Sequence, residues 1–216
     1  MTENEARQLL VDSGIRLVNA GLTSGTWGNL SLRIGDTEML VTPSGKEYLK
    51  IRPGDLTLVD IVTEDWSGPK PSSEYKLHTA VYRTRNEICA IIHNHSPNAS
   101  VVAAARREVP PVLDDLAQLI GPSVRVAEYA LPSTKAIVKK TLKALKGRNG
   151  ALMANHGAIC LGRDMEEAFT CCEVLDKGCK AFVEAEFLGG AKEINRFEAA
   201  LMHQIYLRKY SKLRMK

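Results

Sequence analysis

Three histidines are the residues of this chain best suited to chemistry. His93 and His95 form a His-x-His pair directly after the apolar run 91–92. An apolar run of this kind predicts a buried β-strand, on which residues two apart point to the same face, so both imidazoles would converge on one point. His156 follows a second apolar run and precedes Gly157, so a third imidazole could arrive at a tight turn from another strand end. Three imidazoles leave a fourth coordination position open, which is typical of a catalytic zinc site.

The same pattern has a simpler explanation, namely core histidines whose ring nitrogens are satisfied by backbone carbonyls. Glu74 favours the metal site, because it follows Ser72 and Ser73 at a predicted helix start, where the helix dipole favours a carboxylate or a phosphate. A helix-stabilising charge in the first turn is the alternative for Glu74. His78, on the same helix face, is either a rival ligand or a packing residue. His203 has no partner in the sequence, and we interpret it as structural or exposed.

Three clusters of small residues could hold an anion. Each offers unhindered backbone N–H groups, hydroxyls or amides, and concave arrangements of N–H groups bind phosphate. The clusters are Gly28 with Asn29, Ser44 with Gly45, and Ser72 with Ser73. Taken singly, each is an ordinary turn. The sequence contains neither a Walker A loop nor a glycine fingerprint for dinucleotides, so we do not expect a bound dinucleotide.

The composition excludes several classes of protein. A chain of 216 residues that is 44% hydrophobic and 25% charged is typical of a soluble globular protein, and we predict a single domain over residues 1–216. The net charge of +4 comes largely from basic residues near the C-terminus, which we interpret as a solvated end without nucleic-acid binding. No apolar stretch reaches the roughly 20 residues of a membrane span, and the first residues do not resemble a signal peptide. We therefore expect a cytoplasmic protein without membrane contact.

The five cysteines are odd in number and lack Cys-x-x-Cys spacing. This pattern favours free core residues over disulfides or a cysteine-ligated zinc.

The elements that must position these residues are helices and short strands. Capping residues and apolar periodicity predict helices over about 2–20, 71–82, 96–105, 134–145, 164–188 and 194–210. Alternating apolar residues predict an antiparallel meander of strands over about 30–34, 39–42 and 56–60, in addition to the strands that lead to the histidines. Strands flanked by several helices indicate a layered α/β or α+β domain.

Five ordered motifs together resemble the class II aldolase/adducin family, and within it the fuculose-phosphate aldolases most closely. They are Gly-Thr-x-Gly-Asn-Leu-Ser at 25–31, Thr-Pro-Ser-Gly at 42–45, Pro-Ser-Ser-Glu at 71–74, His-Asn-His at 93–95 and Asn-His-Gly at 155–157. The resemblance is collinear from about Arg7 to the C-terminus. It implies an α/β fold, a three-layer α/β/α sandwich with a mainly antiparallel central sheet. It also implies a homotetramer with active sites near subunit interfaces.

The resemblance implies roles for individual residues. His93, His95 and His156 would bind one Zn²⁺ per subunit, and Glu74 would be the fourth ligand and the acid/base. The substrate phosphate would be bound by Gly28, Asn29, Ser44, Gly45, Ser72 and Ser73. Tyr210 would be a C-terminal tyrosine that reaches the active site, and Tyr206, one turn earlier, is the other candidate. The alternative is that these tyrosines are core or surface aromatic residues. Mn²⁺, Co²⁺ or Ni²⁺ would also suit three imidazoles and a carboxylate.

The implied activity is a zinc-dependent aldolase. It would reversibly cleave a ketose 1-phosphate, such as L-fuculose 1-phosphate or a 5-deoxypentulose 1-phosphate, to dihydroxyacetone phosphate and a small aldehyde. Cleavage leaves an enediolate, whose negative charge a divalent metal stabilises while a carboxylate moves the proton on C3.

Other activities in the family are alternatives. They are a sugar-phosphate 4-epimerase, and a decarboxylase or dehydratase of phosphorylated sugar acids. The motif at 71–74 favours the aldolase, because the family's ribulose-phosphate epimerases resemble Pro-Ser-Ser-Asp there. A non-catalytic, adducin-like interaction module is a hypothesis of another class, and it predicts that the metal ligands have been lost.

The chain departs from the fuculose-phosphate aldolases at two places. Their tyrosine after the His-x-His helix is replaced by the segment 112–115, and Pro132 stands where they have a phenylalanine in the aldehyde pocket. The aldehyde is therefore left open. Asp114 or Asp115 is either a proton donor or hydroxyl contact near the site, or part of a solvated turn.

Overall fold

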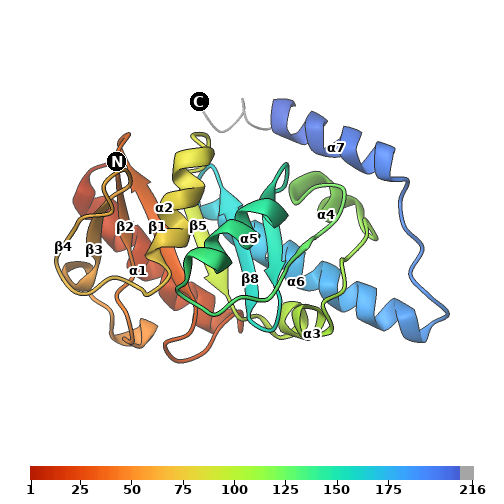
Figure 1. Cartoon of the computed structure of the whole chain (residues 1–216), viewed down its shortest axis with the longest axis horizontal. Coiled ribbons are helices and arrows are strands. Elements are labelled where there is room, and N and C mark those ends of the chain that lie inside the picture. Colours follow the sequence, from red (N-terminus) through yellow and green to blue (C-terminus); the bar gives the residue numbers. More distant parts are fainter. Residues whose placement is uncertain (210–216) are drawn as a thin grey trace.

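The computed structural model describes residues 1–209, so Tyr210 lies outside the described residues. Within that range the strands form one eight-stranded sheet of order β4-β3-β2-β1-β5-β8-β7-β6 (Figure 1). The strands are β1 (Asn29–Ile34), β2 (Glu38–Val41), β3 (Thr57–Asp60), β4 (Trp66–Ser67), β5 (Ala90–Asn94), β6 (Val126–Ala127), β7 (Gly150–Met153) and β8 (Gly157–Gly162). The pairing of β6 with β7 is parallel and the other pairings are antiparallel, so the sheet is mixed but mostly antiparallel.

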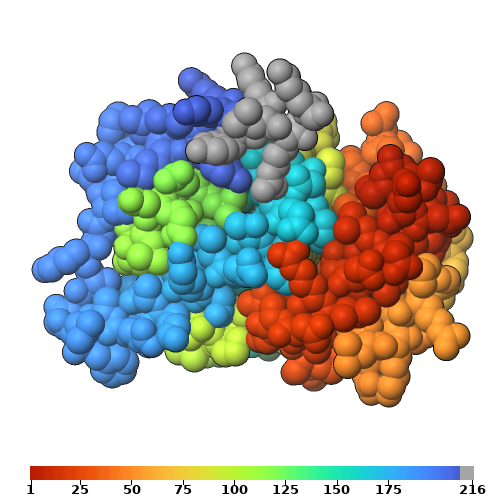
Figure 2. Space-filling model, turned by 180° about the vertical axis from the view of Figure 1, so that it is seen from behind, coloured from red at the N-terminus to blue at the C-terminus, as the bar shows by residue number. Residues whose placement is uncertain are grey.

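Helices pack on both faces of this sheet. They are α1 (Glu3–Asn19), α2 (Tyr75–Thr84), α3 (Pro97–Ala105), α4 (Asp114–Leu119), α5 (Lys135–Leu145), α6 (Met165–Phe187) and α7 (Arg196–Lys209), with short 3-10 turns at η1 (Tyr48–Lys50) and η2 (Pro53–Asp55). Figure 1 shows α2 and α5 in front of the sheet, and Figure 2 shows α1 in red and α6 in blue covering the opposite face. None of the helices in the described range is both long and apolar enough to span a bilayer.

The central strands are covered on both sides because their side chains alternate between two apolar clusters. On β5, Ile92 joins the cluster beneath α1, α3 and α6, whereas Ile91 joins the cluster beneath α2 and α5. Every residue of β5 and β8 is buried. A strand that is covered on both faces has a continuous apolar sequence, and the sequence shows such a run directly before the histidines.

Local sequence signals placed most helix ends correctly. Thr2 and Glu5 form the predicted capping box of α1, and Asp164 caps α6 by accepting a hydrogen bond from the Glu167 backbone. All five cysteines are free, and four of them are buried while Cys89 is half-buried.

Two predictions about helices were wrong in detail. Glu74 was predicted in the first turn of its helix, but α2 begins at Tyr75, so Glu74 occupies the N-cap position itself and its side chain makes no capping hydrogen bond. The segment after Pro110 and Pro111, for which a solvated turn was one of two alternatives, forms the short helix α4, whose first turn holds Asp114 and Asp115.

Close approach of backbone segments brings the candidate site together at the end of β5. Asn29 pairs with His93 across β1 and β5. Gly28 has a φ of +78°, and a Cβ there would lie 2.5 Å from the His93 carbonyl oxygen. A Cβ on Gly157 would lie 2.4 Å from the carbonyl oxygen of Asn94. Glycines at both positions therefore let three chain segments meet without side chains between them.

Candidate metal and phosphate site

The three histidines meet beyond the end of β5. His93 lies in β5, His95 follows the strand, and His156 lies in the turn between β7 and β8. The His93 Nε2 atom is 3.0 Å from Nε2 of His95 and 3.3 Å from Nε2 of His156. Within residues 1–209 these three side chains form the group able to hold a metal ion, with ligand atoms all within 4.8 Å of one another.

A backbone carbonyl fixes the tautomer of His93. Its Nδ1 atom lies 2.9 Å from the Ala158 carbonyl oxygen, which can only accept a hydrogen bond. Nδ1 therefore carries the proton, and Nε2 presents a lone pair to the other two imidazoles, as in many metal-binding histidines. Burial, followed by the charges of His93 and His156, lowers the pKa of His95 to about 3. A neutral His95 is the form that binds metal.

Glu74 lies beside this group of donors. Its side chain is only 6% exposed, and its Oε2 atom lies 3.2 Å from His93 Nε2 and accepts a hydrogen bond of 3.3 Å from the Asn29 amide. Its Oε1 atom lies 3.9 Å from His156 Nδ1, and neither of these two atoms has a hydrogen-bond partner. Buried polar atoms are rarely left unpaired. Three clustered imidazoles with a buried carboxylate beside them therefore fit a divalent cation.

The other two described histidines have different surroundings. His78 is buried, and its Nδ1 atom lies 2.7 Å from Ser31 Oγ, which in turn lies 2.8 Å from the hydroxyl oxygen of Tyr82. The Nδ1 atom of His203 donates to the Gln118 carbonyl, which joins α7 to α4. We therefore assign both residues to the interior packing.

The three clusters predicted to bind phosphate lie beside the histidines. One cavity, which we call the histidine hollow, is lined by Gly28, Asn29, Ser44, Gly45, Ser72, Ser73, Glu74, His93, His95 and His156, together with Thr26, Trp27, Pro43 and Pro132. Backbone hydrogen bonds from Ser44 to Lys70 and from Ser72 to Thr42 hold two of the loops together. The hollow thus joins donors from three separate loops to the imidazoles.

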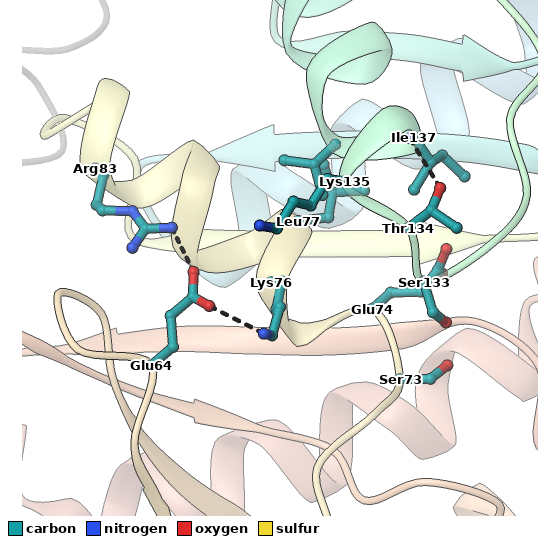
Figure 3. Close-up of a pocket in the computed structure, with 11 residues that line it drawn as sticks. Glu64, Ser73, Glu74, Lys76, Leu77, Arg83, Ser133, Thr134, Lys135 and Ile137 are labelled. Carbon is teal, nitrogen blue, oxygen red and sulfur yellow. Dashed lines mark hydrogen bonds and ion pairs between the residues drawn. The ribbon is translucent and has the colours of Figure 1, made fainter.

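The described lining of the histidine hollow contains no lysine or arginine. A second cavity adjoins Glu74 and Ser73 between α2 and the start of α5 (Figure 3). There the Glu64 carboxylate lies between Lys76 and Arg83 and pairs with both, at 3.4 and 2.6 Å. Lys46 pairs with Asp55 at 2.6 Å. These cations are therefore engaged by carboxylates, and neutral donors line the histidine hollow.

Several residues considered from the sequence lie elsewhere in the fold. Asp115 pairs with Lys177 on α6, and neither Asp114 nor Asp115 lines the histidine hollow. The Tyr206 hydroxyl donates to the buried Glu167 carboxylate at 2.7 Å, so this tyrosine joins α7 to α6.

Sequence reasoning missed two aromatic side chains beside the histidines. A further cavity, the aromatic hollow, is lined by Ser24, Trp27, His95, Tyr129, Ala130, Pro132, Asn155 and His156. The Trp27 ring stacks on His95, with centroids 5.8 Å apart and planes at 27°. A signal was present, because Trp27 is a large aromatic residue within a loop of glycines and hydroxyl residues.

The family model for the class II aldolase and adducin N-terminal domain matches residues 8–183. The chain belongs to this family. It is similar to a 5-methylthioribulose-1-phosphate/5-deoxyribulose-1-phosphate aldolase of Rhodospirillum rubrum, at 37% identity over 75% of this chain and 73% of that protein. It is also similar to a 5-deoxy-D-ribulose 1-phosphate aldolase of Bacillus thuringiensis, at 32% identity over 89% of this chain and 91% of that protein.

Fuculose phosphate aldolases are similar in sequence and in structure. The Escherichia coli K12 protein is 32% identical over 78% of each chain. A solved L-fuculose 1-phosphate aldolase superimposes with a TM-score of 0.89 at 34% identity, over 94% of this chain and 96% of that one. The chain is therefore a class II, metal-dependent aldolase with the class II aldolase fold, which confirms the family and the enzyme class predicted from the sequence.

Proposed function

We propose that this aldolase reversibly cleaves a ketose 1-phosphate, such as L-fuculose 1-phosphate or a 5-deoxypentulose 1-phosphate, to dihydroxyacetone phosphate and a small aldehyde. The names of similar proteins support this substrate class. The observation that carries the proposal is the histidine hollow, in which a metal-binding donor set, a buried carboxylate and three clusters of phosphate donors line one cavity.

We assign the metal, Zn²⁺, to His93, His95, His156 and Glu74. A divalent cation supplies the Lewis acidity that stabilises negative charge developing on the substrate oxygens. The chain's own contribution is to hold the donors: the Ala158 carbonyl orients His93, and burial keeps His95 neutral. Mn²⁺, Co²⁺ and Ni²⁺ suit the same donors, so metal content and reconstitution with each ion test the assignment.

Glu74 is the acid/base in this proposal. The Asn29 amide holds its Oε2 atom, whereas its Oε1 atom has no hydrogen-bond partner and is free to accept a proton from C3 of dihydroxyacetone phosphate in the condensation direction. In the cleavage direction the same carboxyl group returns the proton to C3. Its burial limits competition from bulk water for that proton.

The phosphate is held by neutral donors. Ser72 and Ser73 precede the first turn of α2, where backbone N–H groups and the helix dipole favour an anion. Gly28 and Gly45 have left-handed φ values of +78° and +71° and leave their N–H groups unhindered. Binding of the phosphate would fix the position of C3 relative to Glu74. Holding the two reacting groups close together in this way would accelerate the proton transfer.

Deuterium exchange tests the proposal without requiring the aldehyde. NMR follows exchange from D₂O into C3 of dihydroxyacetone phosphate, with and without a strong chelator and after return of Zn²⁺. We expect Zn²⁺-dependent exchange that Glu74→Gln slows by about 100-fold or more, the usual size of a general-base effect. Glu64→Gln is the matched control, because Glu64 is a nearby carboxylate outside the histidine hollow. A zinc-loaded protein that does not exchange, or a Glu74→Gln variant as fast as wild type, would refute the proposal.

Three further expectations accompany this function. The helices on both faces of the sheet support a three-layer α/β/α sandwich. A homotetramer with active sites near the subunit interfaces stays a prediction that sedimentation velocity tests. A cytoplasmic location stays a prediction as well.

A further inference from the structure

The metal-binding histidines stand between two cavities. His95, His156, Trp27 and Pro132 line both the histidine hollow and the aromatic hollow. The residues assigned to phosphate line the first of these and not the second. On the proposed function, the phosphate and C1 to C3 of the ketose occupy the histidine hollow. The part of the substrate that leaves as the aldehyde therefore extends from the metal into the aromatic hollow.

The aromatic hollow presents mainly apolar surface. Trp27 is 64% exposed and Tyr129 is 45% exposed, although both lie beside a buried polar site. Exposed aromatic side chains that gather at a cavity are typical of a binding surface. Ala130 and Pro132 add aliphatic surface to the same cavity.

One polar side-chain atom of the aromatic hollow, the amide oxygen of Asn155, is engaged within the protein. The amide oxygen of Asn155 accepts two hydrogen bonds from Arg106, at 3.0 and 2.8 Å. The same guanidinium lies 5.9 Å from the centre of the Tyr129 ring, so Arg106 connects both residues. Among the described residues that line the aromatic hollow, the hydroxyl groups available to a polar substituent are those of Ser24 and Tyr129.

We propose that Trp27, with Tyr129 and Pro132, selects aldehydes whose substituent is apolar, such as an alkyl group or a thioether, over hydroxylated aldehydes. Contact with the Trp27 ring removes apolar substituent surface from water, and a thioether sulfur gains a favourable contact with an aromatic ring. A hydroxyl in the same position loses its hydrogen bonds to water and finds few hydrogen-bond partners in the protein. A hydrophobic pocket discriminates against an added hydroxyl by roughly 100-fold at most, so we expect a preference of about 10- to 100-fold.

The test uses two aldehydes of nearly equal shape. Propionaldehyde and glycolaldehyde carry a methyl and a hydroxyl, respectively, on C2. In condensation, C3 of dihydroxyacetone phosphate loses a proton and bonds to the aldehyde carbon, and the new C4 oxygen gains a proton. We would measure kcat/KM for both, corrected for hydration of each aldehyde, and take their ratio within one enzyme variant. The ratio cancels any change in overall rate that arises because Trp27 also stacks on His95.

We expect wild-type enzyme to prefer propionaldehyde by at least about 10-fold and Trp27→Ala to lose most of that preference. Trp27→Phe should keep most of it, because the aromatic face remains. Trp66→Ala is the matched control: Trp66 is 47% exposed, lies on β4 and lines neither hollow, so its removal should leave the ratio unchanged. A wild-type ratio near 1, or a Trp27→Ala ratio equal to that of wild type, would overturn the proposal.

This inference rests on the proposed function, and the two can fail separately. Wild-type C3 exchange in dihydroxyacetone phosphate requires no aldehyde. Exchange without a preference between the two aldehydes would overturn only the role of Trp27, whereas absence of exchange would overturn the proposed function.

Discussion

Gly28→Ala should be one of the most damaging single-methyl changes in this protein. Gly28 precedes β1, has a φ of +78°, and lies where a Cβ would be 2.5 Å from the carbonyl oxygen of His93. Gly35, in the turn between β1 and β2, has a similar φ of +59°, but a Cβ there would have no other atom within 4 Å. The two alanine variants therefore share the backbone strain and differ in the close contact.

The magnitude follows from these two contributions. A left-handed φ costs an L-residue about 1–2 kcal/mol, partly offset by about 0.4–1 kcal/mol from a less flexible unfolded chain. We expect Gly35→Ala to lose about 1 kcal/mol. In Gly28→Ala the methyl and the His93 oxygen must also separate from 2.5 Å to at least 3.0 Å. Overpacking of this kind adds about 1–3 kcal/mol, so the total loss is about 3 kcal/mol.

Urea denaturation of the metal-free variants measures this difference, and thermal melting gives a second readout. For a chain of this size, 3 kcal/mol corresponds to a fall in Tm of about 6–12 °C. The displaced His93 backbone should also slow C3 exchange in Gly28→Ala, whereas Gly35→Ala should exchange like wild type. Equal losses of unfolding free energy in the two variants would refute the reasoning, because the close contact would then cost nothing.

Three other predictions concern metal, pH and the last helix. Zn²⁺ at 100 times its Kd should raise the free energy of unfolding of the metal-free protein by about 2.7 kcal/mol, and His156→Ala should remove most of that gain in urea titrations; a gain that survives would place the ion elsewhere. Burial lowers the pKa of His78 to about 3 from 6.5, so the folded state takes up fewer protons than the unfolded state as the pH falls below 6.5. Between pH 7.5 and 5.5 this should cost the metal-free protein about 1.4 kcal/mol, a loss that His78→Gln should lack and that equal pH dependence in both proteins would contradict. Tyr206→Phe removes a hydrogen bond to the buried Glu167 and should lower the free energy of unfolding by about 1–3 kcal/mol, and a stability equal to that of wild type would count against this contact.

Much of the fold could be predicted because its signals are local. Capping residues such as Thr2 and Asp164 act on backbone groups within one turn, so they fix helix starts without reference to the rest of the chain. Short alternating segments likewise indicated the meander of β1, β2 and β3. The helix α4 and the two-residue strands β4 and β6 were missed, because six and two residues give too little periodicity to identify an element. The strand β8 was not predicted either.

The sequence by itself determined the family and the set of candidate donors. His93 and His95 are two residues apart after an apolar run, a spacing that places both side chains on one face of a strand, and five ordered motifs carry the family resemblance. Residue type and spacing therefore suffice to predict both the family and the candidate donors. The role of each donor in metal or phosphate binding stays a prediction, which the exchange and zinc experiments address.

Only the tertiary structure decided how those donors face one another. Glu74 could have capped its own helix, but pairing of β1 with β5 brings Asn29 and the histidines to its carboxylate. The stacking of Trp27 on His95 likewise joins residues far apart in the chain. Such contacts depend on strand register and on glycines at close approaches of the backbone, and neither is encoded in any single local segment.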